Sequence, residues 1–410
     1  MAKDYSHRLG KKKIRVLAKD GSPVAGKPVK VEMQRHEFLF GGGIFDVVPY
    51  ASGEMKDPLN REAFEQKFEK WNALMNNATL PFYWGGFEPE EGKPRNEQVM
   101  AGAKFLKEHG VTLKGHPLCW HTNCADWLMK YSNEEILRKQ IARIHRDVGY
   151  FAGVIDMWDV INEVVIMPIF DKYDNAVTRI CQELGRVKTV KTMFDAARET
   201  NPNAKLLIND FNLSTNYQIL IDGCLNAGVS IDEIGLQTHQ HQGYMGADKL
   251  QEVLERYEVF HKPMHFTEIT LTSGHIMPSE IDDLNDYKVD EWPTTPEGED
   301  RQAQQFVEMY EILFSHPLVC TAYTWEFVDG GWLGAPAGFL RKDGSTKPVY
   351  DAVYDLVKKQ WWTNTEVVTD ENGEAVVEGY RGDYKLTCCG VETDLALRKG
   401  QLDGVKTMIV

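Results

Sequence analysis

The sequence predicts an α/β fold, a (β/α)8 barrel with a small β module built from the N- and C-terminal segments. The main observation is an alternation of β-prone runs and helical patterns, which repeats eight times between Phe38 and about Lys359. Strict alternation indicates parallel strands joined by crossover helices. Eight repeats favour a closed barrel, with an active site at the C-terminal ends of its strands. An open doubly wound sheet is the alternative, but no Gly-x-Gly-x-x-Gly fingerprint follows the first strand.

The individual elements follow from composition and from the residues at their ends. The predicted strands are Phe38–Gly42, Ala73–Leu80, Thr112–Cys119, Met157–Asn162, Lys205–Asn209, Glu233–Gln237, Met264–Thr267 and Thr321–Trp325. The predicted helices are Arg61–Trp71, Glu97–His109, Asn133–Val148, Asn175–Glu199, Asn216–Ala227, Ala247–Phe260, Asp300–Phe314 and Val349–Val357. Ser132 gives the third helix a cap-like start, and Gly110, Gly228 and Pro263 mark returns from helix to strand.

Both ends of the chain contain short alternating runs separated by polar turns. Lys13–Leu17 and Val29–Met33 flank one such turn, and Glu366–Val368 and Ala375–Val377 flank another, so each pair predicts a hairpin. Neither hairpin is large enough for a core of its own. We expect the two to pair into one accessory module, and two separate flaps are the alternative. The predicted domains are an N-terminal β segment (1–40), the barrel (41–359) and a C-terminal β segment (360–410).

Composition excludes several classes of partner. The chain has 46 basic and 61 acidic residues and a net charge of −15, which argues against nucleic acid and anionic membranes as partners. No apolar run approaches the roughly 18 residues of a membrane span. The N-terminus lacks the apolar core of a signal peptide, so we expect a cytoplasmic protein, or a secreted one if a signal peptide has been trimmed. The 7 scattered cysteines predict reduced thiols, and no His/Asp cluster has metal-ligand spacing, so we expect no metal and no cofactor.

Two glutamates stand in a setting that suits cleavage of glycosidic bonds. Glu163 and Glu268 each follow a short β-prone run and have uncharged neighbours, which places each at the C-terminal end of a predicted strand. Retaining glycoside hydrolysis needs two carboxylates from separate strands, one as nucleophile and one as acid and then base. A single buried glutamate at a strand end is more often a salt-bridge partner, so the surrounding residues decide between these interpretations.

Six ordered segments lie where barrel strands should end: Gly115–His121 with Asp126–Leu128, Trp158–Glu163, Ile208–Asn212, Gly235–His239, Thr267–Glu268, and Trp325 with Trp332–Pro336. Together they resemble glycoside hydrolase family 10, whose typical members are endo-β-1,4-xylanases, over about residues 38–358. The terminal β segments are similar to flanking β elements in one branch of that family.

The resemblance implies a retaining, endo-1,4-β-xylanase-like hydrolase that cleaves β-1,4-linked xylan-type polysaccharide or oligosaccharide by double displacement. Glu163 matches the acid/base, whose pKa should be raised by burial and by the second carboxylate, and Glu268 matches the nucleophile. One alternative is the same mechanism on a different or decorated β-glycan, with endo or exo action. Another is a non-catalytic carbohydrate-binding barrel. The oligomeric state is left open.

The same resemblance implies which side chains bind substrate. His239 should donate to Glu268, Gln237 should hold either carboxylate, and Asn162 should bind the 2-hydroxyl of the sugar under attack. Lining residues of the cleft would be His116 and Trp120 on the non-reducing side, with Trp325 and Trp332 as apolar walls. Asp159 and Asp210 are expected to support these groups through hydrogen bonds.

The sequence departs from the family at three places, one of which is Asn123, where a Gln is usual. Thr79-Leu80-Pro81-Phe82-Tyr83-Trp84 replaces the Glu-Asn-x-x-Lys-Trp segment that binds the sugar beyond the scissile one. We expect Leu80 and Tyr83 to face the cleft there, with Tyr83 in contact with substrate. Linear xylan should then be a poor substrate, and a substituted or different sugar a better one. Thr270 stands where the family has an Asp that orients the histidine.

Overall fold

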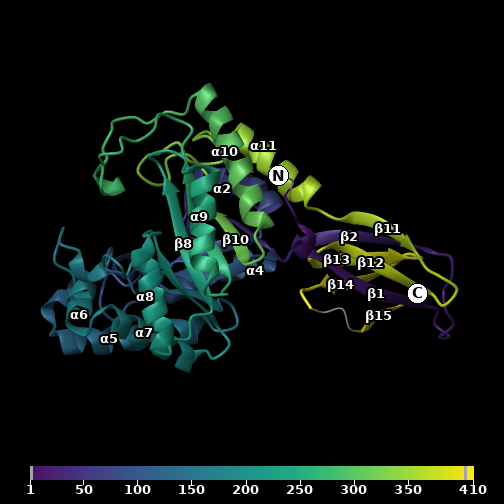
Figure 1. The fold of residues 1–410 in the computed structure, drawn as a ribbon, viewed down its shortest axis with the longest axis horizontal. Coiled ribbons are helices and arrows are strands. Elements are labelled where there is room, and N and C mark those ends of the chain that lie inside the picture. Colours follow the sequence, from purple (N-terminus) through teal and green to yellow (C-terminus); the bar gives the residue numbers. More distant parts are fainter. Residues whose placement is uncertain (1–2, 401–403) are drawn as a thin grey trace.

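The centre of the computed structural model, which describes residues 3–400 and 404–410, is a closed barrel of parallel strands (Figure 1). Around the barrel the strands are β3 (Leu39–Gly42), β4 (Asn77–Pro81), β5 (Thr112–His116), β6 (Met157–Asn162), β7 (Lys205–Asp210), β8 (Glu233–Gln240), β9 (Met264–Leu271) and β10 (Val319–Thr324). The barrel closes where Thr321 of β10 pairs with Leu39 of β3. The predicted (β/α)8 barrel is confirmed, and the open sheet is wrong.

Helices follow the barrel strands and cover the barrel. They are α1 (Val47–Ala51), α2 (Pro58–Leu74), α3 (Trp84–Phe87), α4 (Asn96–Glu108), α5 (Asn133–Phe151), α6 (Ala176–Leu184), α7 (Arg186–Thr200), α8 (Thr215–Asn226), α9 (Gly246–Glu258), α10 (Pro296–Ser315) and α11 (Pro348–Asp355). Short 3-10 turns are η1 (Ser6–Arg8), η2 (Asp126–Lys130), η3 (Met167–Ile169) and η4 (Leu284–Asp286), and a π-helical turn, η5 (Leu356–Gln360), follows α11. The expected cap of α5 forms a full capping box between Ser132 and Glu135.

Several predicted elements differ from the structure at their ends, and two of the differences have a clear local cause. The strand expected to begin at Ala73 begins at Asn77, because α2 continues to Leu74. Leu74 extends the buried helical stripe of Phe64, Phe68 and Trp71 and so stays helical. The helix expected over Asn175–Glu199 is two helices, because Gly185 adopts a φ of +76° between them.

The β module contains two small antiparallel-rich sheets from both ends of the chain. Its strands are β1 (Leu9–Leu17), β2 (Pro28–His36), β11 (Asn364–Val368), β12 (Glu374–Tyr380), β13 (Gly382–Cys388), β14 (Val391–Leu397) and β15 (Val405–Ile409). The sheet orders are β12-β1-β15 and β11-β2-β13-β14. Each sheet combines strands from both termini, so the single module is confirmed and the two separate flaps are wrong.

The hairpins predicted within each end are wrong. β1 and β2 lie in different sheets, and so do β11 and β12. The two sheets bury their apolar faces against each other around Ile14, Val31 and Leu386, and the strand β11 at the edge stays largely exposed. In a hairpin, two strands that are neighbours in the sequence pair within one sheet. In this sandwich, such neighbours lie in different sheets, and each sheet is completed by strands from the other end of the chain. The domain boundaries near residues 40 and 360 stay predictions.

The module lies at the end of the barrel where the strands begin. Arg8 is 5% exposed and its guanidinium donates to the carbonyls of Phe314, His316 and Val319, at 2.9, 2.7 and 2.8 Å. Val319 is the first residue of β10, so Arg8 joins the N-terminal segment to the base of the barrel. The ring of Tyr5 packs edge-on against Trp361, with centroids 5.7 Å apart. The opposite end of the barrel is left free for a site.

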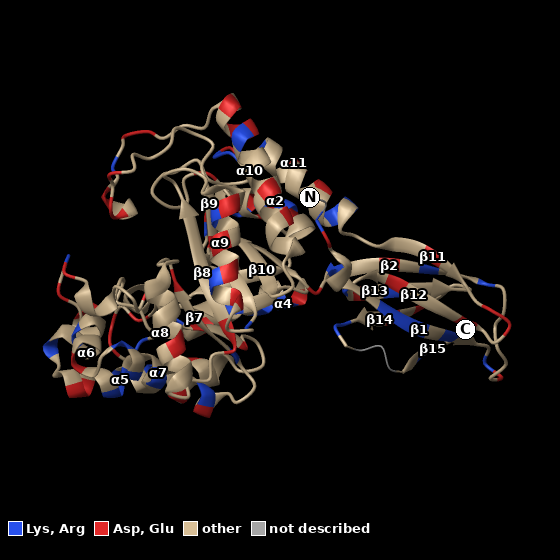
Figure 2. Cartoon of the chain, in the orientation of Figure 1, with Lys and Arg blue, Asp and Glu red and all other residues tan. Residues whose placement is uncertain are grey.

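Charges of both signs are spread over the barrel helices and the module (Figure 2). The basic residues of β1 face acidic residues of β12: Lys11 pairs with Glu378, and Lys13 and Arg15 pair with Glu374. Within the described part of the chain, we find no helix with the length and apolarity that crossing a membrane requires.

Candidate active site

Glu163 and Glu268 meet at the C-terminal end of the barrel, joined by two side-chain amides. Glu163 directly follows β6, and Glu268 lies within β9. The Asn162 amide nitrogen donates to Oε1 of Glu163 at 3.2 Å. Asn209 Nδ2 donates to Oε1 of Glu268 at 2.9 Å and to Oδ1 of Asn162 at 2.8 Å. One hydrogen-bond network therefore contains both predicted catalytic carboxylates.

Asn209 is a further side chain of the site, and the sequence motifs predicted no role for it. It lies in register with Asn162 across β6 and β7, which brings the two amides together. Its carbonyl oxygen accepts from the Thr267 hydroxyl at 2.7 Å, which fixes the orientation of the amide. Gly235 leaves the space for it, because a Cβ there would lie 2.4 Å from the Asn209 oxygen. The signal was present in the Ile208–Asn212 segment, since a strand-end polar residue in a barrel faces the cleft.

The surroundings of Glu163 favour its protonated form. Burial, and next the negative charges of Asp210 and Glu268, raise the pKa of Glu163 to about 8. Two weaker effects act the other way, because Trp120 Nε1 donates to Oε2 at 2.8 Å and Gln237 Nε2 donates to Oε1 at 3.3 Å. The backbone of Glu163 has a φ of +55°, a left-handed conformation that is uncommon outside glycine. At neutral pH this carboxyl is an acid with a proton to give.

The surroundings of Glu268 favour its ionised form. Burial alone would raise the pKa of Glu268, but the hydrogen bond from His239 and the nearby cationic groups outweigh it and lower the pKa. His239 Nε2 lies 3.0 Å from Oε2, and Asn209 donates to the other oxygen. The surroundings therefore shift the pKa values of the two glutamates in opposite directions. This arrangement lets one site hold both an acid and a carboxylate that acts as base or nucleophile.

A buried ion pair lies below His116 in the barrel. Lys114 Nζ and His116 Nδ1 both contact Oδ2 of Asp159, at 2.6 and 2.7 Å. Burial alone would raise the pKa of Asp159, but Lys114, followed by His116, lowers it to about 2. Asp159 fixes the His116 ring, in keeping with the supporting role expected for it. The sequence did not predict Lys114 in the site, because a lysine within a predicted strand is usually exposed.

Aromatic rings form a continuous arc around the two carboxylates. Successive rings along this arc have centroids 4.6 to 6.0 Å apart and are Trp332, His239, Trp325, His116, Tyr83 and Trp120. Trp120 ends the arc at its hydrogen bond to Glu163. The structure therefore brings the predicted side chains together, including Gln237 and Asn162. The contact of Asn162 with a sugar stays a prediction, since its amide is occupied by Glu163, Asn209 and Gln237.

Two of the departures from the family have different consequences in the structure. Leu80 is fully buried in the main hydrophobic cluster, so the expectation that it faces the cleft is wrong. Its side chain is removed from solvent there and offers no surface to a sugar. Tyr83, in contrast, is partly exposed and its ring meets His116 and Trp120. Thr270 contacts Nδ1 of His239 through its hydroxyl at 2.9 Å and so orients that ring without a charge.

Comparison with known sequences identifies the family. The profile of glycosyl hydrolase family 10 matches residues 53–356, most of the chain. The chain belongs to glycosyl hydrolase family 10. Among characterised relatives, an endo-1,4-beta-xylanase/feruloyl esterase from Xylanibacter ruminicola is 24% identical over 68% of this chain and 40% of its own length. The anti-sigma-I factor RsgI6 of Acetivibrio thermocellus is 23% identical over 91% of this chain and 44% of its own.

The chain therefore spans less than half the length of these two relatives. Among solved structures, a GH10 protein from Paenibacillus barcinonensis matches with a TM-score of 0.64 and 21% identity, over 79% of this chain and 96% of that one. At this identity the match shows that the two share a fold.

Proposed function

We propose that this chain is a retaining β-glycan hydrolase of the endo-1,4-β-xylanase type, acting on β-1,4-linked xylan-type polysaccharide or oligosaccharide. Glu268 attacks the anomeric carbon while Glu163 gives its proton to the leaving oxygen, so the glycosidic bond breaks and a covalent glycosyl-enzyme forms. Glu163, now ionised, takes a proton from a water molecule. The resulting hydroxide oxygen bonds to the anomeric carbon and displaces Glu268, which returns as a carboxylate.

The observation that carries this proposal is the pair of contrasting environments around two linked glutamates. Glu163 has its pKa raised to about 8 by burial and by Asp210, whereas Glu268 has its pKa lowered by its hydrogen bond from His239. A structural salt bridge would give each carboxylate a cation. In the described residues, the direct partners of Glu163 are a tryptophan and two amides. A neutral acid beside an ionised carboxylate is what double displacement uses.

The aromatic arc supports a sugar as the ligand. Trp325 and Trp332 offer ring faces on which the apolar side of a pyranose can pack, and His116 and Trp120 border the side of the cleft near Glu163. His239 and Gln237 hold the two carboxylates. We assign no metal or cofactor to this chemistry, since each step uses protons and a carboxylate of the chain.

Tyr83 favours a second candidate, the same mechanism on a decorated or different β-glycan. Its ring stands between His116 and Trp120, so it meets a ligand with a stacking surface and one hydroxyl. A charged lysine, usual here in the family, would offer several donors instead. Two earlier expectations stay predictions: that the chain binds no nucleic acid, and that it acts in the cytoplasm or outside the cell.

Hydrolysis of a substrate panel tests the proposal. The unmodified protein, Glu163→Ala and Glu268→Ala are incubated with linear xylan, arabinoxylan and mixed-linkage β-glucan, and the first-formed products are followed by NMR. Release of the β-anomer by the unmodified protein alone supports a retaining β-glycanase, and the preferred polymer decides between the two candidates. Release of the α-anomer would refute retention. Binding of a glycan without release of any reducing end would support the non-catalytic barrel instead.

A further inference from the structure

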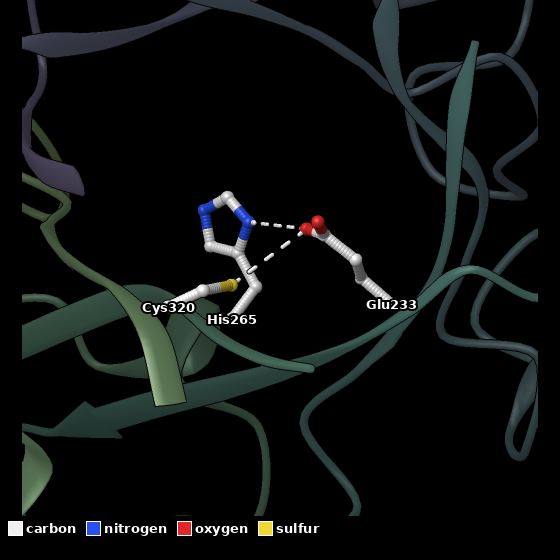
Figure 3. A group of neighbouring side chains, drawn as sticks. All are labelled: Glu233, His265 and Cys320. Atoms are coloured by element: carbon white, nitrogen blue, oxygen red, sulfur yellow. Dashed lines mark hydrogen bonds and ion pairs between the residues drawn. The ribbon is translucent and has the colours of Figure 1, made fainter. Parts of the chain in front are cut away.

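Three potential metal ligands converge at the end of the barrel opposite the glutamates. Glu233 is the first residue of β8, His265 the second of β9 and Cys320 the second of β10. One donor atom of each lies within 4.8 Å of the others, as Figure 3 shows. Oε2 of Glu233 is 3.7 Å from His265 Nδ1 and 3.8 Å from Cys320 Sγ. The residues are far apart in sequence, which is why spacing revealed no ligand set.

The backbone of β10 turns the thiol toward this point. The register of β10 against β9 shifts between Val319 and Thr321, so Cys320 is the extra residue of a β-bulge. A bulge leaves one residue unpaired and re-aims its side chain. In a regular strand, the side chains of successive residues point to opposite faces of the sheet. Without the shift in register, the Cys320 thiol would therefore be separated from Glu233. The convergence therefore depends on a specific irregularity in an otherwise regular strand.

His265 supplies an independent sign of a ligand. Its ring is fully buried, and neither ring nitrogen has a hydrogen-bond partner among the described residues. The 3.7 Å separation from Glu233 is too long for a hydrogen bond. A buried polar group without a partner is destabilising and calls for a water or an ion as its partner. The nitrogen that faces Glu233 and the thiol is correctly placed to bind one.

Glu233 is held in an orientation that leaves one oxygen available. Lys205 Nζ contacts Oε1 at 3.0 Å, so Oε2 faces His265 and Cys320. Glu233 and Cys320 also line a cavity of about 870 Å³ between the barrel base and the β module, which gives a small ion and its water a path to the site. The cavity lies at the opposite end of the barrel from the aromatic arc.

We propose that Glu233, His265 and Cys320 form a zinc-binding site at the base of the barrel. Zinc takes mixed carboxylate, imidazole and thiolate ligands in a tetrahedral arrangement, with a water in the fourth position when the protein supplies three. Bond lengths of about 2.0–2.3 Å place neighbouring donors roughly 3.3–3.6 Å apart, so the two separations from Glu233 need to close by only a few tenths of an ångström. The His265 and Cys320 donors lie within 4.8 Å of each other and close by the remaining distance when the ion binds. Binding releases the thiol proton of Cys320 to solvent and joins three adjacent strands.

The charges around the site set the sign of a second test. Lys205 pairs with Glu233, the buried Lys114 lies near His265, and Arg8 lies near Cys320. These cations weaken zinc binding, so removing the nearest one strengthens it. Lys205→Met should raise the affinity for zinc, whereas a merely structural role of Glu233 in pairing Lys205 predicts no such gain.

Titration of the full-length, chelator-treated protein with zinc chloride tests the proposal, with calorimetry and elemental analysis as readouts. We expect one zinc per chain and, with cobalt chloride, a thiolate-to-cobalt absorption band. Cys320→Ser should abolish that band, and His265→Ala and Glu233→Gln should each weaken zinc binding at least tenfold. Cys389→Ser is the matched control, because Cys389 lies beside Cys388 at the end of β13 and is not one of the three proposed ligands. This substitution should leave zinc binding unchanged.

Binding that persists unchanged in Cys320→Ser and Glu233→Gln, or is lost in Cys389→Ser, would overturn the site, as would the lack of stoichiometric zinc in the unmodified protein. Circular dichroism of each variant, recorded beforehand, limits the comparison to folded proteins, and Glu233→Gln preserves size for this reason. Glycan hydrolysis should persist in chelator. The zinc site and the proposed hydrolase activity can therefore fail independently.

Discussion

Replacing Trp120 by phenylalanine should move the alkaline limb of the pH–rate profile upward. Trp120 Nε1 donates to Oε2 of Glu163 at 2.8 Å and stabilises the ionised form of that carboxyl. Loss of this donor raises the pKa of Glu163 above its value of about 8, so the acid keeps its proton to a higher pH. Phenylalanine keeps an aromatic ring beside Tyr83 and cannot donate a hydrogen bond.

The size of the shift follows from the strength of the hydrogen bond. A hydrogen bond to a charged group contributes about 1.5–3 kcal/mol, and one pKa unit corresponds to about 1.36 kcal/mol, which gives roughly 1–2 units. Trp120 is only half-buried, so water replaces part of the lost interaction. We therefore expect a shift of about 1 unit.

Asp210→Asn provides a comparison of opposite sign. The pKa of Asp210 is raised by burial to about 7, so this group is ionised where Glu163 titrates, and its negative charge raises the pKa of Glu163. Removing that charge lowers the pKa of Glu163, and the alkaline limb should move downward.

The assay is kcat/KM against pH for an unactivated xylo-oligosaccharide, whose leaving group needs a proton. An aryl glycoside with an activated leaving group is the control, because its first step needs none and its alkaline limb should respond less. An unchanged limb in Trp120→Phe, or shifts of the same sign in Trp120→Phe and Asp210→Asn, would refute the assignment of the acid to Glu163.

Three further predictions address the roles of single side chains. Glu268→Ala should abolish turnover of every substrate, whereas Glu163→Ala should lose about 10²–10⁴-fold on xylan and retain most of the first step on activated aryl glycosides. Tyr83→Lys should shift preference from decorated substrates toward linear xylo-oligosaccharides, measured as the ratio of the two kcat/KM values. Arg8→Ala should lower the free energy of unfolding by about 3 kcal/mol in urea denaturation, because several buried carbonyls lose their donor.

Each has an outcome that contradicts it. Equal losses of Glu163→Ala on activated and unactivated substrates would remove its acid/base role. If the unmodified protein already cleaves linear xylan at about 10 s⁻¹ or more, Tyr83 does not restrict the substrate. For Arg8, the control is Lys11→Ala, which breaks an exposed pair and should change stability by about 0.5 kcal/mol or less. Equal effects of the two substitutions would mean that Arg8 contributes no more than a surface charge.

The sequence by itself determined the barrel and the identity of the candidate carboxylates. Parallel strands with crossover helices have a distinct periodicity, and eight repeats have one compact closed arrangement. The positions of Glu163 and Glu268 followed, because strand ends in a barrel are also cleft positions. These inferences need only local pattern and order along the chain, and the resemblance to a family supplied the roles.

Only the tertiary structure decided which side chains touch. The structure has a two-layer sandwich in place of the hairpins expected at each terminus. The apolar faces of the two sheets are buried only when strands from both ends of the chain are combined. The register of β6 and β7 brought Asn209 between the glutamates, and a one-residue bulge brought Cys320 to Glu233 and His265. Leu80 turned out to lie in the hydrophobic core rather than in the cleft. Register and bulges depend on pairing between distant segments, and a shift of one residue reverses the face that a side chain occupies.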